Sequence, residues 1–93
     1  MPAFLLAFSV TAEESQYFVC SHDSKTSTTI GLVYTNPPSK LPCKVTYAHG
    51  EKTDTLWQAT TIQNYCQAKT TNFIAQKKRL GYRCKPTAAP TSN

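Results

Sequence analysis

The sequence contains few of the residues on which enzyme active sites depend. Its five acidic residues are scattered, so no pair of carboxylates typical of glycoside hydrolases can be recognised. With three glycines, the chain has no glycine-rich phosphate loop. His22 beside Asp23 and His49 near Glu51 fall in predicted turns or strand ends, and their spacing does not bring them together as a catalytic or metal-binding set. We therefore expect no enzyme, no cofactor and no metal, and keep a small hydrolase as the second alternative function.

The chain also lacks an apolar run of the roughly 20 residues that a membrane-spanning helix needs. Residues 1–12, MPAFLLAFSVTA, are apolar and end in Val10-Thr11-Ala12, whose small residues suit cleavage by signal peptidase before Glu13. This segment has no Lys or Arg and is shorter than a complete signal peptide, so we interpret it as a truncated remnant of one. The alternative is a first strand or an arm of the domain. The signal-peptide interpretation predicts a periplasmic or secreted protein.

No two of the four cysteines form a C-x-x-C pair, which argues against a zinc ribbon or a thioredoxin-type site. A chain of 93 residues forms one domain at most, and its small core leaves a thin stability margin. Two disulfides, each contributing about 3 kcal/mol, would offset this. Small domains rich in disulfides belong to oxidising compartments. The alternative is four buried thiols in a cytosolic protein.

Four segments have the composition or the alternation of β-strands. They cover residues 17–22, 26–34, 41–47 and 53–59. Turn residues separate them, and the Pro37-Pro38 pair makes a firm break because proline cannot donate to a β-ladder. Gly31, inside the second segment, marks either a bulge or a close approach of another group to the backbone.

After the fourth strand the apolar spacing becomes helical, which predicts a helix over residues 61–80. Its apolar face carries Ile62, Cys66, Phe73 and Leu80. Thr60 or Thr61 can cap the first turn, and Gly81 is a natural residue to follow the last one. Residues 82–85 are expected to be extended, and the polar tail 87–93 to be disordered.

These elements predict an α+β fold over residues 13–86, in which a four-stranded antiparallel sheet packs against one C-terminal helix in the order ββββα. Trp57 is the expected core anchor, together with Phe73 and Leu80. Ligand stacking is the alternative role for Trp57.

Geometry ranks the three possible disulfide pairings. If strands three and four are antiparallel, Cys43 lies beside the start of the helix, where Cys66 is found. Cys84 lies beyond the far end of that helix. A Cys66–Cys84 bond would have to reverse about 20 Å of helix with extended residues that span about 13 Å. The pairs Cys43–Cys66 and Cys20–Cys84 are therefore favoured.

Positive charge is concentrated near the end of the predicted helix, in a chain with a net charge of +5. The candidate contact patch consists of Lys77, Lys78, Arg79, Arg83 and Lys85. Cations in the last turn also favour the negative end of the helix dipole, so a solvated helix end is the alternative interpretation. An exported chain rarely meets nucleic acid, so we expect an anionic envelope component or an acidic protein as the partner.

A longer pattern links these features: C-x-V-x-Y, L-W-x-A, Y-C-x-x-K, F and G-Y-x-C, preceded by Tyr17-Phe18-Val19-Cys20-Ser21-His22. Its positions are Cys43, Val45, Tyr47, Leu56, Trp57, Ala59, Tyr65, Cys66, Lys69, Phe73, Gly81, Tyr82 and Cys84. Over about residues 13–84 the chain resembles a family of small exported four-cysteine proteins of Gram-negative bacteria. That family usually has Trp where Tyr82 stands. The resemblance implies export and disulfides but transfers no function, because the family's members are uncharacterised.

The function that we expect from the sequence is a non-enzymatic binding module of the cell envelope, such as an inhibitor or an immunity-type protein. The alternative is a basic protein that binds anionic glycan or lipid through the C-terminal end of its helix. The sequence identifies neither the partner nor the oligomeric state.

Overall fold

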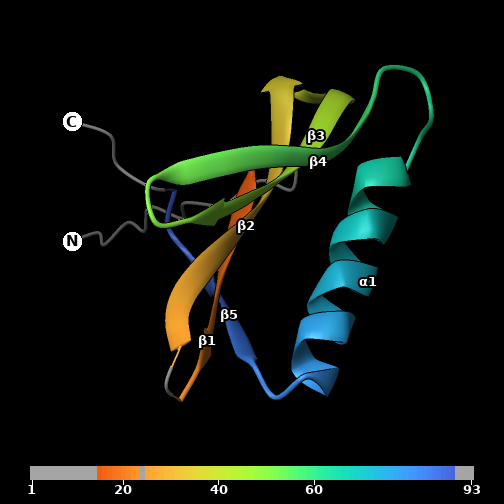
Figure 1. Cartoon of the computed structure of the whole chain (residues 1–93). Coiled ribbons are helices and arrows are strands. Elements are labelled where there is room, and N and C mark those ends of the chain that lie inside the picture. The colour runs from red at the N-terminus through yellow and green to blue at the C-terminus, as the bar shows by residue number, and fades with distance from the viewer. Residues whose placement is uncertain (1–14, 24, 90–93) are drawn as a thin grey trace, which may run out of the picture.

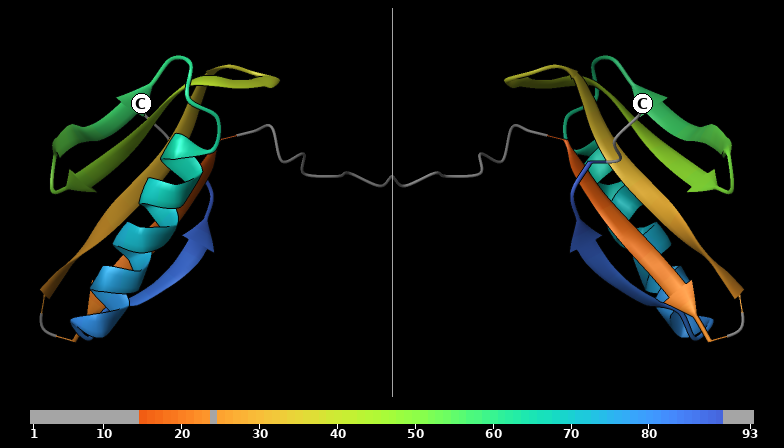
Figure 2. Two further views of the ribbon diagram at one scale, coloured as in Figure 1. Left: turned by 90° about the vertical axis from the view of Figure 1, so that its right-hand side faces the viewer. Right: turned by 90° about the vertical axis from the view of Figure 1, so that its left-hand side faces the viewer.

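The computed structural model describes residues 15–23 and 25–89. In chain order its elements are β1 (Gln16–His22), β2 (Lys25–Asn36), β3 (Ser39–His49), β4 (Lys52–Ala59), α1 (Tyr65–Arg79) and β5 (Arg83–Thr87). These strands form one antiparallel sheet in the order β4-β3-β2-β1-β5, and α1 lies across one of its faces (Figures 1 and 2). The expected α+β class, with one sheet and one helix, is confirmed.

The prediction of four strands was wrong, because the sheet has five. β5 pairs with β1, with Cys84 opposite Cys20 and Thr87 opposite Tyr17. Its sequence, RCKPT, lacks apolar alternation, and Pro86 cannot donate to a ladder, which is tolerated because β5 lies at the sheet edge. Thr87, which was predicted to begin the disordered tail, is the last residue of this strand.

Two predictions concern the ends of the chain. The proposed signal-peptide remnant, residues 1–12, lies outside the described residues, and so do residues 90–93 of the tail. Within the described part, each of the four predicted strands falls inside one of β1 to β4. The Pro37-Pro38 pair forms the tight turn between β2 and β3.

The helix is shorter than predicted at its start. Its N-cap is Asn64, in the left-handed region at φ 62°, and no side chain caps the first turn, so neither Thr60 nor Thr61 has the expected role. Ile62 therefore precedes the helix and is 59% exposed. In the part of the chain that is described, no helix is long and apolar enough to cross a membrane.

Leu80, which was expected in the core, is 67% exposed. It is the C-cap residue, in the turn where the chain leaves α1 for β5, so it is not held on the helix face that buries Cys66 and Thr70. Trp57 and Phe73 do pack against the core, with ring centroids 5.8 Å apart, but both are only half-buried.

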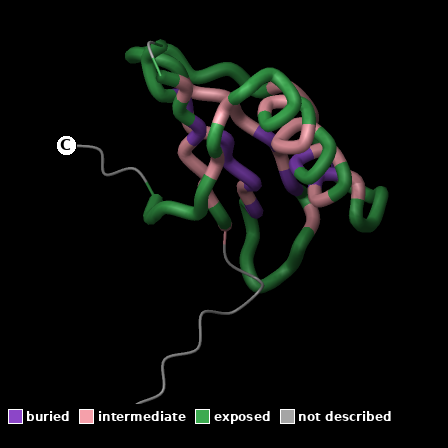
Figure 3. The backbone as a smooth tube through the Cα atoms, turned by 90° about the horizontal axis from the view of Figure 1, so that it is seen from below, coloured by how far each residue is buried: buried purple, intermediate pink, exposed green. Residues whose placement is uncertain are grey.

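The core lies between α1 and the sheet, where the buried segments of the backbone face one another (Figure 3). The buried hydrophobic residues are Cys20, Ile30, Leu32, Tyr34, Cys43, Val45, Ala59 and Cys66. On the other face of the sheet the ring of Tyr17 lies over Gly31. A Cβ at position 31 would come within 2.5 Å of the Thr46 Oγ1 and 3.0 Å of that ring, so Gly31 marks a close approach and not a bulge.

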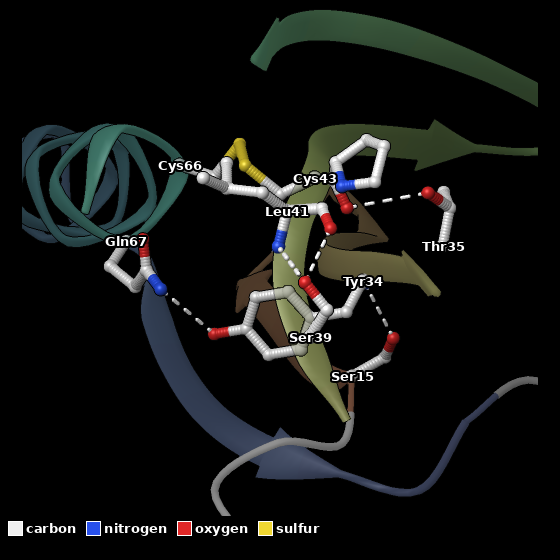
Figure 4. Close-up of a disulfide and its surroundings, with 9 residues drawn as sticks. Ser15, Tyr34, Thr35, Ser39, Leu41, Cys43, Cys66 and Gln67 are labelled. Atoms are coloured by element: carbon white, nitrogen blue, oxygen red, sulfur yellow. Dashed lines mark hydrogen bonds between the residues drawn. A yellow bond between two sulfur atoms is a disulfide. The ribbon is translucent and has the colours of Figure 1, made fainter. Parts of the chain in front are cut away.

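One disulfide joins the helix to the sheet, and the other joins the edge strand β5 to β1. Cys43–Cys66 ties β3 to the first turn of α1, with Cα atoms 6.2 Å apart (Figure 4). Cys20–Cys84 joins directly opposed residues of β1 and β5, with Cα atoms 4.0 Å apart. These are the two pairs that the sequence favoured. Beside the first bond, the Gln67 amide donates a hydrogen bond to the Tyr34 hydroxyl at 3.2 Å.

Candidate functional site: a basic pole

The structure divides the predicted contact patch among three environments. Lys78 and Arg79 are exposed in the last turn of α1, and Lys77 beside them is half-buried. Arg83 and Lys85 are exposed on β5 and flank Cys84, whose disulfide faces the core under α1. Because side chains alternate across a strand, these two residues belong to the opposite face of the sheet. The patch therefore wraps around the β5 edge.

Lys77 belongs to the packing between α1 and β3. Its Nζ donates a hydrogen bond to the Tyr47 hydroxyl at 2.7 Å. The same Nζ lies 4.8 Å from the ring centroid of Tyr47, 5.6 Å from that of Phe73 and 4.6 Å from that of Tyr82. Cations over aromatic faces are attracted by the ring quadrupole. Lys77 is thus held inward by three rings and is not a free charge of the patch.

The pKa of the Tyr47 hydroxyl reflects this contact. Burial raises the pKa, but hydrogen bonding to Lys77, a smaller contribution from Thr28 and the Lys77 charge together lower it below its ordinary value. The Thr28 contact is a weak one, because its buried Oγ1 has no hydrogen-bond partner of good geometry among the described residues. The Lys77 ammonium therefore dominates the lowering.

Lys69 makes a similar contact two helical turns earlier. Its Nζ lies 5.3 Å from the Trp57 ring centroid and 5.5 Å from that of Tyr65. Lys69, Phe73 and Lys77 are spaced four residues apart and so share one side of α1. The ammonium groups of the two lysines thus lie over aromatic rings that the single helix leaves half-buried.

A polar hollow of about 270 Å³ lies where the β1–β2 turn meets the chain leaving α1. Its lining residues are Ser21, His22, Asp23, Lys25, Ser27, Gly81 and Arg83. The sheet register explains this convergence, because Lys25 lies opposite His22 on one side of β1 and Arg83 lies opposite Ser21 on the other. Two cations from β2 and β5 thus flank the end of β1.

His22 forms the inner wall of this hollow. Its ring packs edge-on against Tyr82, with centroids 5.0 Å apart. Gly81, at φ +97°, lies so close that a Cβ there would come within 2.8 Å of the His22 Nε2. Nδ1 of His22 is buried and has no hydrogen-bond partner in the described part of the protein.

We define the basic pole as four residues at this end of the molecule: Lys25 and Arg83, which line the hollow, and Lys78 and Arg79 in the last turn of α1. Figures 1 and 2 both place the β1–β2 turn, the C-terminal end of α1 and the start of β5 at the same end of the molecule. Asp23 contributes one negative charge there. Sequence reasoning did not place Lys25 and His22 in the patch, because Arg83 is brought beside them only by the β1–β5 pairing, which was not predicted.

The two histidines are kept apart by the sheet. His49, at the end of β3, packs edge-on against Tyr47 with ring centroids 6.2 Å apart. It lies opposite Thr28 of β2, which in turn lies opposite Cys20 of β1, so β2 separates His49 from His22. Within residues 15–23 and 25–89, no group of three or more His, Cys, Asp and Glu is arranged to hold a metal ion.

The chain was also compared with models of protein families, with curated proteins and with solved structures, and none of the three comparisons gave a match. The resemblance to exported four-cysteine proteins therefore stays a prediction, and the function must be argued from the basic pole itself.

Proposed function

We propose that this protein is a non-enzymatic binding domain, exported to the periplasm or the cell exterior, whose basic pole binds an anionic glycan or lipid headgroup of the cell envelope. The observation that carries this proposal is the convergence of Lys25, Lys78, Arg79 and Arg83 from three elements, β2, α1 and β5, on one end of the fold. Like charges repel one another, so such a cluster raises the free energy of the free protein and favours an anionic partner.

Two further observations support the proposal. The disulfides join α1 to β3 and β5 to β1, and α1 and β5 carry three of the four cations of the pole, so little conformational entropy is lost when a ligand binds. Two of the cations, Lys25 and Arg83, also line a concave polar hollow, which suits a single anionic group better than the flat face of an acidic protein. Export is supported by the same disulfides, because such bonds persist in oxidising compartments.

The test is retention of the oxidised protein on an anionic polysaccharide matrix, eluted by salt. Lys78→Ala/Arg79→Ala should elute at much lower salt than the wild type, because each phosphate- or sulfate-paired cation adds to the salt dependence. The matched control is Lys40→Ala/Lys52→Ala, which removes the same charge from two exposed residues of the β2–β3 and β3–β4 hairpins.

Equal losses in the two variants would show that net charge alone drives retention and would overturn the proposal. Retention that fails on glycan and vesicle matrices, with a stable complex formed instead with an acidic envelope protein, would replace it by the inhibitor or immunity-type function.

A further inference from the structure

We propose that the hollow at the basic pole is a binding site for one tetrahedral oxyanion, a phosphate or sulfate group, with Arg83 and Lys25 as its charged ligands. This inference rests on the proposed function and names the chemical group that the pole recognises.

The hollow is lined by several hydrogen-bond donors. Arg83 supplies a guanidinium fork, Lys25 an ammonium, and Ser21 and Ser27 supply hydroxyls. Arg83 and Lys25 stand on the two strands that flank β1, so they approach the hollow from opposite sides. An anion with oxygens pointing in several directions can accept from both sides at once, whereas a planar carboxylate pairs with one fork.

His22 lines the same hollow. Its Nδ1 is buried without a hydrogen-bond partner among the described residues, which is unfavourable for a polar atom. Tyr82 and Gly81 hold the ring in place. His22 therefore presents a fixed imidazole at the wall of a hollow that two cations also line.

Asp23 is the one acidic residue among the described residues that line the hollow. Its carboxylate opposes any anion, so the site needs a ligand with enough charge to interact with both cations. A dianionic phosphate monoester or a sulfate group meets this requirement better than a neutral sugar. Because the same carboxylate weakens binding of the anion, a neutral residue at position 23 should strengthen binding, whereas loss of a cation should weaken it.

The experiment is a titration of the full disulfide-bonded chain with inorganic phosphate, and separately with sulfate, followed by two-dimensional ¹H–¹⁵N NMR. We expect saturable shifts confined to the amides of the hollow and to the His22 ring. Arg83→Gln should weaken binding about ten-fold, because a charge-assisted hydrogen bond is lost. Asp23→Asn should tighten it several-fold. Lys40→Gln, at an exposed hairpin position, is the control and should change nothing.

Arg83 is exposed, so its substitution should leave the fold intact, and unchanged shifts elsewhere in the spectrum verify this. Shifts that do not saturate, that spread over Lys40 and Lys52 as much as over the hollow, or that persist unchanged in Arg83→Gln would overturn the inference. So would an Asp23→Asn protein that binds phosphate more weakly than the wild type.

Further arms distinguish the sources of the oxyanion. A phosphorylated monosaccharide, a sulfated monosaccharide and vesicles of phosphatidic acid in phosphatidylcholine present the group on sugar or lipid, and the strongest Arg83-dependent binding identifies the source. If retention on anionic matrices depends on Lys78 and Arg79 but no phosphate or sulfate titration saturates, this inference falls and the proposed function stands. If inorganic phosphate saturates the hollow but no glycan or vesicle is bound, the proposed function falls and the oxyanion site stands.

Discussion

The two ends of α1 meet the sheet in different ways. The N-terminal end is uncharged over residues 60–68 and is joined covalently to β3 by Cys43–Cys66. The C-terminal end carries Lys77, Lys78 and Arg79 and is held by side-chain contacts of Lys77 with Tyr47 and neighbouring rings. A covalent bond at one end fixes the helix on the sheet, so the other end can gather like charges without the helix detaching.

The hollows near the two ends of α1 also differ in the charged residues that line them. The hollow at the ends of β3 and β4, of about 600 Å³, is lined by residues such as Thr35, Gln58 and Ile62, with Lys44 as its one charged residue. The smaller hollow at the basic pole is lined by His22, Asp23, Lys25 and Arg83 among others. The larger hollow is not the one better suited to an anion, because anion binding depends on positive charge and hydrogen-bond donors more than on volume.

Removing the disulfides should have the largest effect. Cys20→Ala/Cys84→Ala should lower the free energy of unfolding by about 4 kcal/mol and Cys43→Ala/Cys66→Ala by about 3 kcal/mol, from the loop lengths that the bonds close. Those loops span 64 and 23 residues. Urea denaturation followed by Trp57 fluorescence measures both. A larger loss from the shorter loop would show that fixing α1 at its N-terminal end matters more than chain entropy.

The turn that leaves the C-terminal end is the next test. Gly81→Ala should destabilise the fold by about 2 kcal/mol, because a non-glycine residue is strained at positive φ. Its Cβ would also lie 2.8 Å from the His22 Nε2. Gly50→Ala is the matched control: its φ is +65°, and an added Cβ would meet no atom within 4 Å outside its chain neighbours, so about 1 kcal/mol is expected. Thermal unfolding measures both effects: Gly50→Ala reports backbone strain alone, and Gly81→Ala reports strain together with the contact to His22. Equal decreases in Tm would rule out the His22 contact.

The two lysines that cover aromatic rings give a finer comparison of the helix ends. Lys77→Met keeps the stem but loses the hydrogen bond to Tyr47, so about 1 kcal/mol of stability should be lost. Lys69→Met loses only its contacts with Trp57 and Tyr65, for which about 0.5 kcal/mol is expected. Urea denaturation of the two variants checks the order. The reverse order would mean that the N-terminal half of α1 depends more on its lysine.

The smallest effect is a pH dependence at the C-terminal end. Because the pKa of Tyr47 is lower in the folded protein than its ordinary value of about 10, the folded state releases this proton first. Stability from this group therefore rises with pH between the lowered pKa and about 10, and it is lost as the pH falls through that window. Phenolate absorbance should show one tyrosine whose pKa is lower than the ordinary value. Lys77→Met should raise this pKa, because the hydrogen bond and the charge that oppose the effect of burial are then lost. An unchanged titration in Lys77→Met would contradict the assigned cause.

Much of the fold could be predicted because its signals are local. Alternation in residues 41–47 and the Pro37-Pro38 break are properties of short segments, and each predicted strand lies within an observed one. The start of α1 was misplaced because its N-cap, Asn64, adopts a left-handed conformation and makes no side-chain capping hydrogen bond, so the usual capping pattern does not apply. β5 was missed because its only support is pairing with β1, more than 60 residues earlier in the chain.

The site was harder to predict than the fold, because a run of cations does not reveal what each one faces. Lys77 is adjacent to Lys78 in sequence, yet one is held by aromatic rings and the other is exposed. Lys25 is distant in sequence from Arg83, and only their common neighbour β1 brings them to one hollow. These relations depend on strand order, which spacing along the chain does not encode.

The arrangement of the disulfides also determines what a protease can do to this chain. Cys43 and Cys66 lie within the segment closed by Cys20 and Cys84, so the two bonds are nested along the sequence. A cut in the exposed turn at Gly50 and Glu51 would produce two fragments joined by both bonds. Lys25 would lie on one fragment and Arg83 on the other. The cleaved protein would thus remain one covalent molecule in which both halves of the basic pole are still tethered.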